Sequence, residues 1–334
     1  MQSLTPQRAK LGLLATLFAL AVAAIAGPTT AKAAYPSDLD ILTHNVQMLP
    51  VGSFGNVQRA NLIKQAGYIR GHDVVVLQEM FVDSQADIIM NALKSEYPYQ
   101  TPVLGSTRCF GWSSCASGDP RLFAISNGGV AILSKYPIVK MNQHIFREHG
   151  CIPDYVMEKG FVHARIKRAS DYYNVVSTHA QAEECFDGQN SVPMRTRQFQ
   201  EIAAYVNSKI STSEATFIAG DLNVIRGSAE YAPMLATLGV AEPAYTGHPY
   251  TYDTSTNSYA LIACFYCNDA GNIRQWLDYV LPVSAGGRPL PPAWSNDGRN
   301  VKSPSWYFPI PNSLDPLNVQ YNDFSDHYPV LGSG

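Results

Sequence analysis

Short apolar segments, rich in β-branched and aromatic residues and bounded by Gly, Asp and Asn, recur along the whole sequence. This pattern is typical of β-strands. Helical periodicity is clear in longer segments at residues 58–69, 84–93 and 194–210, with Pro193 where the last helix can begin. Strands interleaved with helices predict an α/β fold in which mixed sheets are covered by helices. The clearest strand predictions are residues 40–46, 73–77, 129–133, 161–166, 172–177, 216–219 and 276–281.

The N-terminus has the pattern of an export signal. Arg8 and Lys10 precede an apolar run over residues 11–27, and Ala31-Lys32-Ala33 gives a small-residue cleavage site. The run is short for a membrane span. We therefore predict a secretory signal peptide at residues 1–33 and a secreted, extracellular protein, with a buried N-terminal helix as the alternative. Residues 34–334 have the length of one large domain or two small ones, and we expect a single catalytic domain.

The chain contains six cysteines, which in an exported protein suggest disulfides. Cys109 and Cys115 are close in sequence, as are Cys264 and Cys267, which leaves Cys151 and Cys185. Spacing alone does not decide among the pairings that six cysteines allow. A zinc site at Cys264 and Cys267 is a rival interpretation, although it lacks a second ligand pair nearby.

Polar residues stand where the predicted apolar strands stop. Each one alone has an ordinary explanation as a turn former, a helix cap or a structural histidine. Together they mix carboxylates, carboxamides and imidazoles, which suits a hard cation such as Mg²⁺ together with proton transfer. The sequence has no serine nucleophile elbow and no phosphate-binding P-loop. The residues at strand ends are Asn45, Glu79, His179, Asp221, Asn223, Asp278, Asp326 and His327.

The motifs at these positions resemble those of the endonuclease/exonuclease/phosphatase superfamily, whose fold is like that of deoxyribonuclease I. They come in the order of that superfamily and span nearly the whole chain after the signal. The resemblance implies a four-layer sandwich, in which two packed mixed β-sheets are flanked by helices. The motifs are Asn45, Gln78-Glu79, Thr178-His179, Gly220-Asp221-Leu222-Asn223, Leu277-Asp278-Tyr279 and Ser325-Asp326-His327.

Further segments resemble bacterial neutral sphingomyelinases C. They are residues 127–138 (NGGVAILSKYPI), Lys159-Gly160-Phe161 and residues 321–330 (YNDFSDHYPV). The resemblance also places Cys185 as the partner of Cys151. It implies a Mg²⁺-dependent phosphodiesterase that hydrolyses sphingomyelin at a membrane surface to ceramide and phosphocholine, with Mn²⁺, Co²⁺ or Ca²⁺ as alternative metals.

The same resemblance assigns a role to each site residue. Glu79 would ligate the metal with help from the side-chain oxygen of Asn45, and His327 would be the general base on the attacking water. Asp278 would orient His327, while Asp326 would either contact the metal or orient His327. The remaining roles are orientation of the water by Asp221 and hydrogen bonding to the phosphate by Asn223 and His179.

The chain departs from the family at the residues after Glu79. Members often have Phe-Asp-Asn there, whereas this chain has Met80-Phe81-Val82-Asp83. A second, peripheral metal site would therefore depend on Asp83.

An aromatic cluster, Trp306-Tyr307-Phe308, lies in a region rich in Pro, Ser and Asn at residues 286–316, where we expect long surface loops or a hairpin. One interpretation is that the aromatic residues pack onto the core. The other is a hairpin tip that inserts at the lipid–water interface. Sphingomyelinases of this family carry an aromatic hairpin before Ser-Asp-His, which favours membrane binding by these three residues.

Three other functions share the motifs. A secreted nuclease is disfavoured by charge, because the net charge of −3 would become −6 after loss of the three basic residues of the signal. A phospholipase C of broader specificity, on glycerophospholipids or ethanolamine lipids, would use the same catalytic residues. A catalytically inactive lipid-binding protein would not need all of them. We expect no stable nucleic-acid partner and a monomer.

Overall fold

The first of two large β-sheets carries the N-terminal strand at its centre. The computed structural model describes residues 1, 38–121, 124–183, 185–263, 272–309 and 318–334. The described residues from Asp38 onward form one unit. The strand order is β10 (Ala244–Gly247), β14 (Ser295–Gly298), β17 (Val330–Ser333), β1 (Asp40–Asn45), β2 (Val74–Gln78), β5 (Ala131–Ser134) and β3 (Tyr99–Gln100).

The second large sheet is formed mainly by the middle of the chain. Its order is β13 (Asp278–Pro282), β9 (Ala215–Asp221), β8 (Asp171–His179), β7 (Gly160–Arg168), β6 (Ile138–Ile145) and β4 (Ser117–Gly118). Both sheets mix parallel and antiparallel pairs: β1–β2 and β8–β9 are parallel, whereas β1–β17 and β7–β8 are antiparallel. Two small sheets pair β11 (Tyr252–Asp253) with β12 (Arg274–Gln275), and β15 (Trp306–Pro309) with β16 (Asn318–Tyr321).

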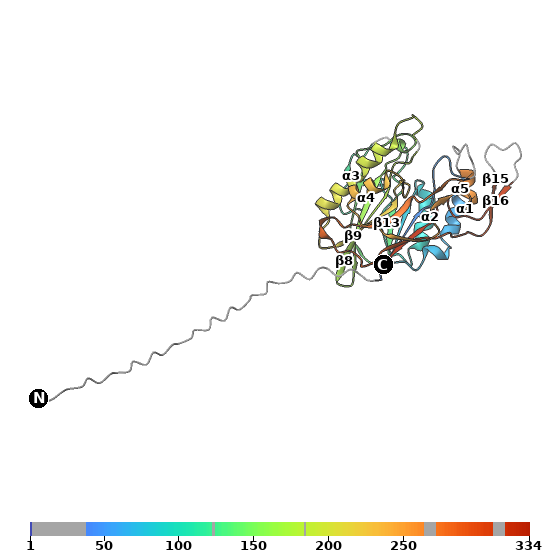
Figure 1. Cartoon of the computed structure of the whole chain (residues 1–334). Helices are drawn as coiled ribbons and strands as arrows, with labels where there is room; N and C mark the ends of the chain where they lie inside the picture. Colours follow the sequence, from blue (N-terminus) through green and yellow to red (C-terminus); the bar gives the residue numbers. More distant parts are fainter. Residues whose placement is uncertain (2–37, 122–123, 184, 264–271, 310–317) are drawn as a thin grey trace. The chain divides into compact units, whose positions relative to one another are not determined.

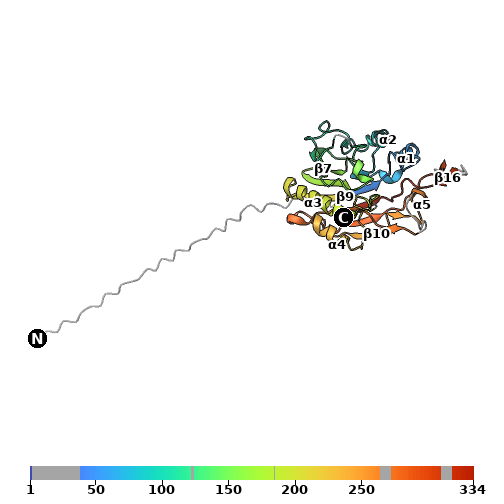
Figure 2. The ribbon, with the colours of Figure 1, turned by 90° about the horizontal axis from the view of Figure 1, so that it is seen from above.

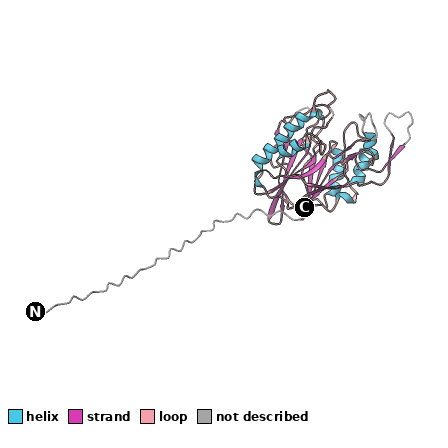
Figure 3. Ribbon diagram, in the orientation of Figure 1, coloured by secondary structure: helices cyan, strands magenta, loops and turns pink. Residues whose placement is uncertain are grey.

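Helices cover the outer face of each sheet, as Figures 1 and 2 show. On one side lie α1 (Asn56–Ile63) and α2 (Asp83–Leu93), and on the other α3 (Ser191–Lys209) and α4 (Tyr231–Leu238). In Figure 3 the strands stand between these helices. The remaining helical elements are α5 (Ser258–Ala263) and the 3₁₀ helices η1 (Gly67–Ile69), η2 (Asp154–Val156) and η3 (Ala285–Gly287).

Successive side chains along a strand point to opposite faces of its sheet, which explains the layers. In β1, Ile41 joins the core between the sheets, while Leu42 packs with residues of α1 and α2. In β9, Phe217 joins the central core and Ile218 packs with residues of α3 and α4. A strand buried on both faces reads as a continuous apolar run, as Val74–Leu77 does in β2. The predicted four-layer α/β sandwich is therefore confirmed.

Two helix predictions differ in detail. The segment 58–69 is split into α1 and η1, and Ala66, between them, is extended at φ −70° and ψ 141°. The third helix begins at Ser191, earlier than residue 194, because the side chain of Asn190 accepts a hydrogen bond from the Val192 N–H and caps it. Pro193 then lies in the first turn, where a backbone N–H is not required.

The segment 286–316 contains more regular structure than the expected loops. Its first part forms strand β14 between β10 and β17 of the first sheet. Its later part forms the first strand of the expected hairpin, β15, which pairs with β16. Strand β14 was missed because its residues, Ser-Asn-Asp-Gly, have the composition of a turn. Within the described residues, no helix is both long and apolar enough to cross a membrane.

Candidate active site at the edges of the two sheets

The candidate active site lies where the predicted strands end. In the first sheet, β1 and β2 run parallel and end together, which brings Asn45 beside Glu79. In the second, the parallel strands β8 and β9 pair His179 with Asp221, and the antiparallel β13 begins with Asp278 opposite Asp221. His327 comes from the segment between β16 and β17. Strand register therefore brings together residues that are far apart in sequence.

Asn45 connects the two sheets at this edge. Its amide nitrogen donates to Oε1 of Glu79 at 2.7 Å and to Oδ2 of Asp221 at 3.0 Å. Its side-chain oxygen accepts from the Gln47 N–H at 3.0 Å. The nitrogen of Asn45, and not the oxygen expected to bind a metal, therefore faces the two carboxylates in this structure.

Glu79 has the chemistry of a cation ligand. Its backbone is left-handed at φ 58°, a strained conformation that is typical of functional sites. Its Oε2 is buried and accepts no hydrogen bond from the described residues. Burial, followed by the carboxylate of Asp326, raises the pKa of Glu79 to about 8. A buried carboxylate oxygen without a donor is costly, and a divalent cation would satisfy it.

Two overlapping groups of side chains could hold a metal ion. The ligand atoms of Glu79, His179 and Asp221 lie within 4.8 Å of one another, and so do those of Asp221, Asp278 and His327. Carboxylate oxygens are the ligands that Mg²⁺ prefers. Burial, followed by the neighbouring Asp278 carboxylate, raises the pKa of Asp221 to about 6. These residues fit a divalent cation bound at Glu79, close to Asp221.

His179 is buried beside two carboxylates and an ammonium group. Its Nε2 lies 3.8 Å from Oε1 of Glu79 and 3.8 Å from Oδ2 of Asp221. Burial, followed by the ammonium group of Lys159, holds the pKa of His179 well below its ordinary value. Lys159 Nζ lies 3.3 Å from Nε2 of His179 and donates to Asp154 at 2.5 Å. Lys159 belongs to a motif that supported the resemblance, but its position in the sequence offered no reason to place it in the site.

Asn223 is held beside His179 by its neighbours. Its side-chain amide donates to the carbonyl of Ala180 at 3.1 Å, and its backbone N–H donates to Oδ1 of Asp221 at 2.9 Å. Its φ of 52° is left-handed, as at Glu79. The Gly-Asp-X-Asn motif thus forms a tight turn that fixes Asn223 at the end of β9.

His327 is paired with Asp278. Its Nδ1 lies 2.8 Å from Oδ2 of Asp278, and its Nε2 lies 3.8 Å from Oδ2 of Asp221. Burial alone would lower the pKa of His327, but Asp278 and Asp221 raise it well above its ordinary value. Asp326 accepts a hydrogen bond from the Ser325 hydroxyl at 3.1 Å. Asp278 and Asp326 were both considered for orienting His327, and it is Asp278 whose carboxylate contacts the ring.

Two buried residues, His44 and Arg59, and the half-buried Tyr68 support these loops, although the sequence did not single them out. Nε2 of His44 donates to the carbonyl of His327 at 3.1 Å, and the Tyr68 hydroxyl donates to Nδ1 of His44 at 2.8 Å. The guanidinium of Arg59 donates to the carbonyls of Val46, Gln47 and Phe324. Among these three residues, the sequence could have suggested a role only for His44, because it directly precedes Asn45.

Asp83 does not lie in a cluster of metal ligands. It begins α2, and its Oδ1 accepts a hydrogen bond from the amide of Asn127 at 2.7 Å. It lines a pocket of about 410 Å³ that also contains Arg108 and Arg121. No described residue joins it in a group of three His, Cys, Asp or Glu ligands. One carboxylate oxygen of Asp83 is thus engaged by Asn127, and the peripheral metal site stays a prediction.

The three residues of the expected membrane-binding aromatic cluster differ in how far they are buried. Trp306 is only 5% exposed, stacks on Tyr321 and donates its indole N–H to the Asp323 carbonyl. Phe308 is half-buried and stacks on Phe54. The membrane role expected for Trp306 is wrong in this structure, because its ring forms the packed base of the hairpin. Tyr307 is 52% exposed.

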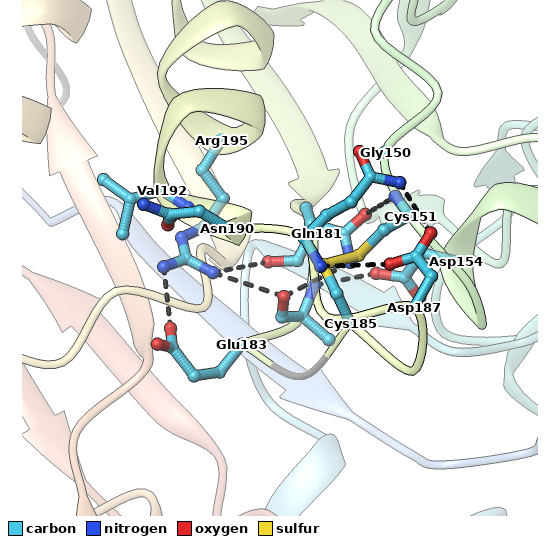
Figure 4. The surroundings of a disulfide bond; sticks show 12 residues. Gly150, Cys151, Asp154, Gln181, Glu183, Cys185, Asp187, Asn190, Val192 and Arg195 are labelled. Carbon is cyan, nitrogen blue, oxygen red and sulfur yellow. Dashed lines mark hydrogen bonds and ion pairs between the residues drawn. A yellow bond between two sulfur atoms is a disulfide. The ribbon is translucent and has the colours of Figure 1, made fainter.

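The structure contains the disulfides Cys109–Cys115 and Cys151–Cys185. Cys264 and Cys267 lie outside the described residues. Figure 4 shows that Cys151–Cys185 lies near Gln181, which follows the end of β8, and near Asp154. The Ala182 N–H donates to Asp154 at 2.7 Å. The disulfide therefore joins two loops that border His179.

Comparisons with known proteins agree with this geometry. The model of the endonuclease/exonuclease/phosphatase family matches residues 42–327. A sphingomyelinase C from Bacillus cereus is 38% identical over 310 residues, covering 88% of each chain. A crystal structure of a double mutant of the Staphylococcus aureus beta toxin, with bound magnesium ions, has a TM-score of 0.80 and 35% identity, covering 89% of this chain and 99% of that one.

A sphingomyelinase C from Leptospira interrogans is 39% identical over 301 residues, but this match covers 51% of the relative and 88% of this chain. The chain thus spans about half the length of that relative and of a second one from the same species, which it covers to 46%. The relatives from other species are matched over most of their length. The chain therefore belongs to the endonuclease/exonuclease/phosphatase family and, within it, to the sphingomyelinase C group.

Proposed function

We propose that this protein is a secreted, Mg²⁺-dependent phosphodiesterase that hydrolyses sphingomyelin to ceramide and phosphocholine. The observation that carries the proposal is the position of Asp221, which lies between a cation-binding group and a histidine–carboxylate pair. Glu79 and His179 flank it on one side, and His327 with Asp278 on the other. A metal-binding group and a general base are thus assembled around one reacting position.

Glu79 would hold the metal ion, close to Asp221. A bound Mg²⁺ polarises a phosphoryl oxygen and stabilises charge on the leaving alkoxide. Because Glu79 Oε2 has no donor among the described residues, it is available for this purpose. Asn45 fixes the distance between Glu79 and Asp221 by donating to both.

Nε2 of His327 accepts a proton from the attacking water. Asp278 fixes the proton on Nδ1 of His327, so that Nε2 carries the lone pair in the neutral ring. Asp221, at 3.8 Å from that nitrogen, can accept the other hydrogen bond of the same water. The carboxylates of Asp278 and Asp221 raise the pKa of His327 well above its ordinary value. Positive charge bound at Glu79 favours the neutral ring that the base requires.

The phosphate oxygens are contacted from the end of the second sheet. Asn223 and His179 lie there, and Lys159 lies 3.3 Å from His179. Amide, imidazole and ammonium groups fixed in a buried position stabilise the charge that develops on the phosphoryl group. Hydrogen bonds to the Ala180 carbonyl keep Asn223 and Lys159 in place before substrate binds.

We also propose secretion by cleavage after Ala33 and action as a monomer. The N-terminal sequence pattern supports the first. Edman sequencing of the protein from the culture medium and sedimentation at several concentrations would test these two points. A mature N-terminus other than Ala34, or a concentration-dependent dimer, would contradict them.

The test of the reaction is release of phosphocholine by purified protein from sphingomyelin vesicles and phosphatidylcholine vesicles, with Mg²⁺ or with EDTA. We expect Mg²⁺-dependent release from sphingomyelin alone. Absence of release from both lipids would remove the proposal, and plasmid DNA would be the next substrate.

A phospholipase C of broader specificity is the second candidate. Two relatives from Staphylococcus aureus, each 36% identical over 300 residues, carry the name phospholipase C. Release of phosphocholine from both kinds of vesicle would favour this activity. Ethanolamine lipids, measured in the same assay, would then define the headgroup preference.

A further inference from the structure

A group of exposed apolar side chains lies beside the candidate active site. We call Ile125, Ile152, Tyr155 and Phe186 the rim patch. Their exposed fractions are 73%, 45%, 49% and 53%. They stand on loops and on the short helix η2. Exposed apolar side chains that gather in one place mark an interaction surface, whereas single ones are ordinary.

Backbone contacts bring together the segments that carry these residues. The Ile125 N–H donates to the carbonyl of Val156 at 2.9 Å, which places Ile125 next to Tyr155. The Phe186 N–H donates to the carbonyl of Ile152 at 3.0 Å, which places those two side by side. Ile152 and Tyr155 belong to the same tight turn. Three segments that are distant in sequence therefore meet at the rim patch.

The rim patch is held in position. The disulfide between Cys151 and Cys185 joins the residues directly before Ile152 and Phe186. The guanidinium of Arg121 donates to the carbonyl of Tyr155 and lies 5.1 Å above its ring. The exposed side chains are thus presented by a cross-linked framework, which lowers the entropy lost on binding.

The framework continues directly into the catalytic centre. Asp154, between Ile152 and Tyr155, accepts from Lys159 Nζ at 2.5 Å, and Lys159 reaches His179. Phe186 belongs to the segment that follows His179. The rim patch therefore lies at the border of the site that would contact the phosphate.

We propose that the rim patch is a docking surface for a lipid bilayer, separate from the β15–β16 hairpin. This inference rests on the proposed lipid substrate, whose phosphodiester lies at the headgroup level of a membrane. Isoleucine and phenylalanine partition into the region below the headgroups, and tyrosine favours the interface itself. Contact at the rim patch brings His179 and Lys159 to the depth of that phosphodiester.

The test uses the full protein with Ile125→Ser, Tyr155→Ser and Phe186→Ser combined, none of which is in the catalytic machinery. The matched control is Val139→Ser, because Val139 is also exposed, at 45%. It lies near the start of β6, whereas the opposite end of that strand pairs with Gly160, next to Lys159. Two readouts are needed: cosedimentation with sphingomyelin vesicles in EDTA, and hydrolysis of vesicles and of a water-soluble choline phosphodiester in Mg²⁺.

We expect the triple variant to bind vesicles about 10-fold or more weakly, because insertion of one large apolar side chain already contributes about that factor. Hydrolysis of vesicles should fall in parallel, while the soluble substrate is cleaved as by the unchanged protein and the Val139→Ser control behaves normally. Unchanged vesicle binding by the triple variant would overturn the inference. Equal loss on the soluble substrate would also overturn it, because the residues would then serve the fold.

The binding readout separates this inference from the proposed function. If the unchanged protein cleaves neither substrate but still binds vesicles through the rim patch, the docking surface stands and the proposed reaction fails. If sedimentation shows that the triple substitution abolishes a dimer, the rim patch is a contact between two copies, and the lipid proposal is wrong.

Discussion

At the scale of single residues, His327 has the most direct predicted consequence. Its Nε2 is directed toward Asp221, and its other nitrogen is engaged by Asp278. Replacing His327 with Ala should lower the turnover of sphingomyelin by at least about 10²-fold, the lower range for general acid–base catalysis. Phosphocholine release measures this. Near-normal turnover by a folded variant would exclude His327 as the base.

Asp278→Asn should change the pH dependence as well as the rate. The carboxylate of Asp278 raises the pKa of His327, so the base is protonated and inactive below that pKa. Without this charge the pKa falls, and the acidic limb of the pH–rate profile should move to lower pH while the maximum rate decreases. Profiles of kcat/KM against pH would show the shift. An acidic limb that stays in place would mean that His327 does not govern it.

Glu79→Gln should weaken the affinity for the metal ion without destabilising the fold. Loss of the charge should raise the Mg²⁺ concentration for half-maximal activity by about 10-fold or more. In EDTA the variant should unfold at the same temperature as the unchanged protein or higher, because it removes the charge of a carboxylate whose buried Oε2 accepts no hydrogen bond from the described residues. Thermal unfolding and metal titration measure the two effects. Glu96→Gln, in a partly exposed ion pair with Arg70, is the control for both.

At the scale of elements, the link between η1, β1 and the His327 loop can be tested through Tyr68. Tyr68→Phe removes the hydrogen bond to His44, which itself holds the His327 carbonyl. We expect kcat on a soluble phosphodiester to fall by about 3–10-fold, since a hydrogen bond contributes about 1 kcal/mol, with KM unchanged. The matched control is Tyr97→Phe, whose hydroxyl donates to the Ile69 carbonyl and has no contact with His44. Equal effects of both substitutions on kcat would contradict a positioning role.

At the scale of the whole molecule, buried histidines predict how stability depends on pH. Burial lowers the pKa of His163 to about 4 and that of His44 to about 4. Because these folded-state values lie below the ordinary one, the neutral forms stabilise the protein at neutral pH, and the stability is lost as pH falls from about 6.5 to 4. The free energy of unfolding should fall by about 3 kcal/mol per histidine over this range.

Urea unfolding at several pH values would measure this dependence. His163→Asn should make the loss between pH 6.5 and 4 smaller by about the contribution of one histidine, about 3 kcal/mol. A variant with the same pH slope as the unchanged protein would show that His163 already binds a proton in the folded state.

Local sequence patterns were enough to predict mixed sheets covered by helices and most of the strands, whereas the four-layer arrangement was predicted from the family resemblance. Strands buried on both faces read as continuous apolar runs, and β2 shows this in Val74–Leu77. Glu79, His179 and Asp221 could be identified because each stands where an apolar strand stops and because their motifs resemble those of a known superfamily. A single sequence records such patterns, since they depend on residue type and spacing along one segment.

Which side chains face one another could be learned only from the folded chain. Asp278, and not Asp326, contacts His327, because antiparallel pairing of β13 with β9 places Asp278 opposite Asp221. Trp306 is buried because the β15–β16 hairpin folds its ring onto Tyr321 and Tyr259. The rim patch needs three segments joined by a disulfide and backbone hydrogen bonds. Such contacts depend on register and long-range packing, which residue type and spacing do not specify.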